Sequence, residues 1–81
     1  MVSADYVKQL IVSGLDCSHI ELEGDDGTHF QAVIVSPQFS GVGRVQRHQL
    51  VYKALGDRMR DEIHALSMKT YSPDEWAKLQ G

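Results

Sequence analysis

The sequence contains two histidines whose positions predict metal chemistry. His29 and His64 each stand at the head of a predicted β-strand, and a helical segment joins the two strands. A strand–helix–strand connection of this length usually makes the strands parallel, so that both begin at the same edge of the sheet. Neutral imidazole is a good ligand for zinc, iron or copper. We therefore expect the two side chains to form half of a metal or cluster site, with the other ligands supplied by a partner.

The sequence does not complete this site by itself. Two histidines cannot fill a tetrahedral site, and no Cys-x-x-Cys, His-x-x-x-His or Asp/Glu triad is present. Phe30 and Leu66 mark the side of the strands that faces the core. His29 is thus predicted to point away from the core, whereas His64 is predicted to lie on the same side of its strand as Leu66, two residues later. The alternative interpretation of each histidine is a partly exposed residue at a strand end.

Local patterns predict the elements that position these histidines. A hydrophobic stripe and the N-cap Ser3 indicate a helix to about Gly14, and alternation of polar and apolar residues indicates a strand at 19–23. The other predicted elements are a strand at 28–35 after a Gly-Asp turn, a helix from Arg44 that Gly56 breaks in two, a strand at 63–71, and a last helix that Ser72-Pro73 starts with a capping box. This order predicts an α+β domain, αββαβα, with one three-stranded sheet and the helices packed on a single face.

Composition is typical of a small folded protein. The 81 residues predict a single domain, residues 1–81, and the 42% of hydrophobic residues are enough for a core. The net charge of −3 gives no overall basic field for nucleic acid. Apolar runs are too short to span a bilayer, and the first residues lack the features of a signal peptide. With the single cysteine, Cys17, these features lead us to expect a cytoplasmic protein without a membrane partner.

A basic segment at 44–60 is the second candidate site. It holds five of the eight Lys and Arg residues, and its predicted phosphate contacts are Arg44, Arg47, His48 and Lys53. A basic helix after a glycine-rich loop can bind phosphates through its side chains and its N-terminal amides. The alternative is the solvated face of an amphipathic helix, and nearby acidic residues dilute the charge. Catalysis has no comparable support, because no serine, histidine or aspartate lies in a nucleophile-elbow context. We therefore predict a protein that is not an enzyme.

Three stretches resemble a known family. They are Gly24-Asp25-Asp26-Gly27-Thr28-His29-Phe30, then Phe39-Ser40-Gly41 followed by Arg44-Val45-Gln46-Arg47-His48-Gln49-Leu50-Val51-Tyr52, and the block Ile63-His64-Ala65-Leu66 that continues to Trp76. Together they cover nearly the whole chain, in order. The chain resembles the BolA-like family, and within it the IbaG-type bacterial branch.

This resemblance implies a domain similar to the class II KH fold and a defined partner. The implied partner is a monothiol glutaredoxin, with which members of this family share a bridging [2Fe-2S] cluster. In that picture a glutaredoxin cysteine and a glutathione thiol hold one side of the cluster. On the other side, His64 and His29 match the two positions from which BolA-like proteins supply ligands. Cys17 precedes the first strand and does not match the cysteine position of other family members.

The sequence leaves three functions open. The first is an iron–sulfur trafficking, sensing or stress-response adaptor that works with glutaredoxin. The second follows from relatives described as DNA-binding regulators, and it would use the basic helix at 44–60. The third is a protein-interaction module without a metal. For the chain alone we expect a monomer or a weak homodimer.

Overall fold

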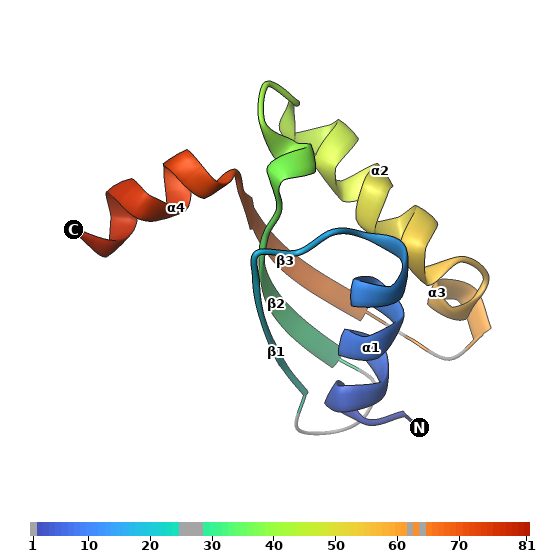
Figure 1. The fold of residues 1–81 in the computed structure, drawn as a ribbon. Helices are drawn as coiled ribbons and strands as arrows, with labels where there is room; N and C mark the ends of the chain where they lie inside the picture. The colour runs from blue at the N-terminus through green and yellow to red at the C-terminus, as the bar shows by residue number, and fades with distance from the viewer. Residues whose placement is uncertain (1, 25–28, 62, 64) are drawn as a thin grey trace.

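The computed structural model describes residues 2–24, 29–61, 63 and 65–81. Its elements follow in this order: α1 (Ala4–Gly14), β1 (His19–Glu23), β2 (His29–Val35), the 3₁₀ turn η1 (Pro37–Phe39), α2 (Arg44–Leu55), α3 (Arg58–Asp61), β3 (Ala65–Tyr71) and α4 (Pro73–Gln80) (Figure 1). The predicted α+β class and element order are confirmed, and α3 follows the break predicted at Gly56. Within the described residues, β3 begins at Ala65 rather than at Ile63, and no helix is long and apolar enough to cross a membrane.

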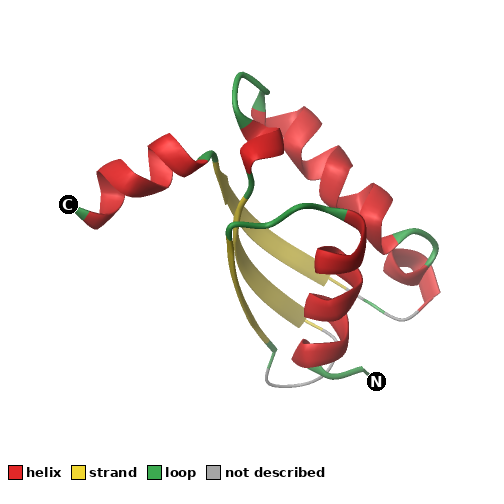
Figure 2. Cartoon of the chain, in the orientation of Figure 1, coloured by secondary structure: helices red, strands yellow, loops and turns green. Residues whose placement is uncertain are grey.

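The sheet has the order β1-β2-β3, with β2 in the centre. β1 and β2 are antiparallel and pair His19 with Val35, whereas β2 and β3 are parallel and pair His29 with Ala65 (Figure 2). The helices between β2 and β3 provide the crossover that a parallel pair requires. The predicted parallel neighbours are therefore confirmed, and both strands begin at one edge.

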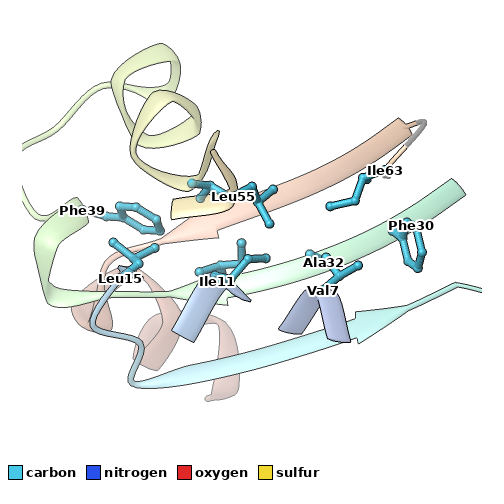
Figure 3. Packing of buried hydrophobic residues seen from close by; sticks show 10 residues of the cluster. Val7, Ile11, Leu15, Phe30, Ala32, Phe39, Leu55 and Ile63 are labelled. Atoms are coloured by element: carbon cyan, nitrogen blue, oxygen red, sulfur yellow. The ribbon is translucent and has the colours of Figure 1, made fainter. Parts of the chain in front are cut away.

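The core lies between one face of the sheet and the helices α1 and α2. Its fully buried side chains come from α1, β2, η1, α2 and the segment before β3, and Figure 3 shows how they pack. They include Val7 and Ile11 of α1, Phe30 and Ile34 of β2, Phe39, Leu55 and Ile63. Alternate residues of β2 point into this core, as expected for a strand with one buried face.

The last helix lies outside this layer. No residue of α4 is buried, and the helix projects from the end of β3 (Figure 1). Its Trp76 stacks on His19 with the ring centroids 5.1 Å apart. The centroid of the same Trp76 ring system lies 5.5 Å from that of the Tyr71 ring. His19, Val35 and Tyr71 lie in register across the three strands, on the face opposite Ile34. The prediction of one helical layer thus holds for α1 and α2, whereas α4 contacts side chains of the other face.

Candidate functional site

The edge where β2 and β3 begin holds the first candidate site. His29 is the first residue of β2 and is exposed, whereas the next residue, Phe30, is only 2% exposed. This confirms that the imidazole points away from the core. The partner of His29 in the sheet is Ala65, which directly follows His64 in the sequence. His64 itself lies outside the described residues.

The described residues contain no complete metal site of their own. In the part of the chain that the structure describes, no three His, Cys, Asp or Glu side chains are grouped to hold a metal ion. Cys17 precedes β1, at the end of the sheet where β2 finishes, about 20 Å from His29 at 3.3 Å per residue. Burial, together with the nearby Asp16, raises the pKa of its thiol. Among the described residues, His29 is thus an exposed imidazole at the start of β2.

The structure brings together three of the four predicted phosphate contacts. Arg44, Arg47 and His48 line a hollow of about 380 Å³ beside β3 and α4. Arg44 is exposed, and His48 is half-buried one turn further along α2. Lys53 is exposed but does not line this hollow. At 100° per residue, the nine positions between Arg44 and Lys53 place the two side chains on opposite sides of the helix.

Arg47 is bound within the chain. Its side chain is 12% exposed and forms an ion pair with Glu75 of α4 at 2.8 Å. The same guanidinium donates to the carbonyl oxygens of Val42 at 2.7 Å and of Thr70 at 3.1 Å, and it lies 5.7 Å from the centre of the Phe39 ring. These contacts join the segment 39–47 to the segment 70–75, which lies more than 20 residues later in the sequence. The guanidinium is therefore a structural tether rather than an exposed contact.

Glu75 is the partner of this tether and also part of a helix cap. Its carboxylate accepts a hydrogen bond from Arg47 and another from the Ser72 amide at 2.8 Å. These bonds lower the pKa of Glu75 from 4.5 to about 2, so the carboxylate is charged at neutral pH. The sequence signals the cap through Ser72-Pro73-Asp74-Glu75, but it contains no sign that Arg47 would meet the same carboxylate.

The comparisons with known proteins agree with this fold. Residues 7–75 match the family model described as BolA-like protein. The chain therefore belongs to the BolA-like family. The acid stress protein IbaG of Escherichia coli K12 is 37% identical over 73 residues, which cover 89% of this chain and 86% of IbaG. This similarity supports a member of the IbaG-type bacterial branch.

A second relative and a solved structure extend the comparison. The DNA-binding transcriptional regulator BolA of Haemophilus influenzae is 43% identical over 49 residues, which cover 60% of this chain and 48% of that protein. The structure of a BolA protein homologue from Coxiella burnetii is 50% identical, with a TM-score of 0.85, and covers 95% of this chain and 99% of that one. The two named relatives are thus a stress protein and a transcriptional regulator.

Proposed function

We propose that this protein is a non-enzymatic partner of a monothiol glutaredoxin and that the two proteins hold a bridging [2Fe-2S] cluster. The role would be iron–sulfur trafficking or iron sensing in the stress response, in the cytoplasm. His29 and His64 would be the ligands from this chain, and a glutaredoxin cysteine and a glutathione thiol would be the others. The observation that carries the proposal is the pairing of His29 with Ala65, next to His64 in the sequence.

One further feature supports this assignment. His29 is exposed at the sheet edge, as a ligand shared between two proteins must be. When bound, the cluster supplies a carrier of iron and of one electron, and imidazole in place of thiolate ligands raises its reduction potential. The part played by this chain is to present its imidazoles at an accessible edge.

The test is anaerobic assembly of the pair with iron, sulfide and glutathione, followed by visible absorption and circular dichroism. His29→Ala and His64→Ala are each expected to alter the cluster spectrum and to shorten its lifetime in air. His48→Ala is the matched control, because it removes an imidazole on α2 that lies away from this edge. An unchanged spectrum and lifetime in both His29→Ala and His64→Ala would disprove the ligand assignment.

DNA binding is the second candidate function. It is favoured by the relative named a DNA-binding transcriptional regulator and by the exposed Arg44 beside His48. Duplex DNA should then bind with an affinity that falls steeply between 50 and 200 mM salt, because phosphate contacts release counterions. Arg44→Ala should weaken this binding more than Lys53→Ala, which lies on the other side of α2. Affinity that does not change with salt, or that falls equally in both variants, would reject this use of the helix.

A further inference from the structure

A continuous groove runs beside β3 between α2 and α4. Its first part is the hollow of about 380 Å³ that Arg44 and His48 border, with residues 68–71 of β3 opposite. Its second part measures about 320 Å³ and extends to Lys78 and Leu79 of α4. The two parts share Thr70, Tyr71 and Glu75, so they form one surface, which we call the α2–α4 groove. In Figure 1 the C-terminal end of β3 lies between these two helices.

The charge of the α2–α4 groove is positive in a chain whose net charge is −3. Arg44, Lys69 and Lys78 line it and are exposed, and no ion pair involves them within the described part of the chain. Glu75 is the one acidic residue among the described residues that line the groove, and the Arg47 ion pair neutralises it. The groove therefore complements an acidic ligand.

The groove also has apolar surface and a fixed shape. Met68 and Tyr71 are half-buried, and Leu79 is 60% exposed at the end of α4. The hydrogen bonds of Arg47 to Thr70 and Glu75 hold β3 and α4 in place beside the N-terminal part of α2. A concave surface with apolar contacts suits a narrow chain that carries side chains of its own, because a nucleic-acid backbone offers only phosphates and sugars to such contacts.

We propose that the α2–α4 groove binds an extended acidic peptide segment of a partner protein. Carboxylates of the segment meet Arg44, Lys69 and Lys78, and an apolar side chain between them contacts Tyr71 and Leu79. The proposal goes beyond the shared cluster, because His29 does not line the groove and no metal takes part. Its test therefore uses the metal-free chain, and its failure would leave the cluster proposal standing.

The experiment measures fluorescence anisotropy of a labelled ten-residue peptide of alternating Glu and Leu, titrated with the full chain. We expect saturable binding that weakens with salt, and no binding of the matched peptide of alternating Lys and Leu. Arg44→Glu combined with Lys69→Glu should weaken binding about tenfold. Lys8→Glu combined with Lys53→Glu makes the same change in net charge away from the groove and should change binding less than twofold.

Leu79→Asp provides an independent variant, because this exposed side chain is not part of the core. It should also weaken binding, and urea unfolding of each variant checks that the fold is intact. Equal weakening by the two double variants, or equal binding of the two peptides, would overturn the proposal. So would displacement of the peptide by DNA at a lower concentration than by unlabelled peptide. Salt-sensitive self-association that Arg44→Glu with Lys69→Glu abolishes would instead make a second copy the occupant, and would likewise overturn it.

Discussion

Arg47 links more segments of the molecule than any other side chain described above. It joins the loop at Val42, the end of β3 at Thr70 and the first turn of α4 at Glu75. Arg47→Ala removes all three contacts and leaves partly buried carbonyl oxygens without their donor. We expect this variant to lose about 2 kcal/mol of unfolding free energy, measured by urea denaturation.

Arg44→Ala is the matched control for this prediction. Arg44 stands one turn earlier on α2 and is exposed, so its loss should cost less than about 0.5 kcal/mol. Equal urea midpoints for the two variants would show that the contacts of Arg47 contribute nothing to stability.

Glu75 gives the fold a defined dependence on pH. Its pKa falls from 4.5 to about 2 in the folded state, chiefly because Arg47 donates to its carboxylate. A lowered folded-state pKa stabilises the protein above pH 4.5, and this contribution is lost as the pH falls from 4.5 to about 2. Glu75→Gln should therefore lower the urea midpoint at pH 7, and the difference from the unchanged protein should disappear near pH 2. A difference that is the same at both pH values would contradict this assignment.

At the residue scale, the sequence predicts some roles and misses others. The strand–helix–strand pattern predicts that His29 lies at the start of a strand parallel to β3, because it uses only chain order and handedness. The interpretation of Arg47 as a phosphate contact rests on its basic neighbours. Its actual partner lies 28 positions away, on an element whose docking no local pattern specifies. A prediction of this ion pair would have required the tertiary fold first.

At the scale of elements, local capping signals predict several boundaries well. Ser3 accepts from the Tyr6 amide, and α1 runs to Gly14 as expected. Both bonds of the predicted capping box are present at the start of α4. The 3₁₀ turn at Pro37–Phe39 is not predicted, because three residues are too few for a periodic pattern. The docking of α4 on the second face is also missed, since it depends on the contact of Trp76 with His19.

The capping box is expected to control the stability of α4 locally. Because α4 has no buried residue, its stability depends on its cap together with the contacts of Glu75 and Trp76. Ser72→Ala removes the side-chain acceptor for the Glu75 amide and should cost about 1 kcal/mol. Amide hydrogen exchange in α4 should then accelerate about fivefold while exchange in β2 stays unchanged.

Ser13→Ala is the control for this measurement. The Ser13 hydroxyl donates to the Gln9 carbonyl within α1, so its loss should leave exchange in α4 as it is. Equal acceleration in α4 and β2 after Ser72→Ala would mean that α4 opens only with the whole domain.

At the scale of the whole molecule, the approach of α1 to α2 depends on a small residue. A Cβ atom built on Gly14 would lie 2.9 Å from the Cβ of Ala54. Gly14→Ala should therefore destabilise the domain by about 1–3 kcal/mol through overpacking, although alanine normally favours a helix. Ala54→Gly should cost less in the Gly14→Ala background than in the unchanged protein. Additive changes in unfolding free energy across this cycle would exclude the contact.

The parallel pairing of β2 with β3 also has a consequence for folding kinetics. His29 pairs with Ala65, a residue 36 positions later, whereas β1 and β2 are neighbours along the chain. Closing such a long loop costs conformational entropy before any contact compensates for it. We therefore expect the antiparallel pair of β1 and β2 to form first and β3 to join the sheet late. The start of β3 would then be among the last parts to join the sheet, so a nascent chain would bring Ala65 beside His29 only when folding is nearly complete.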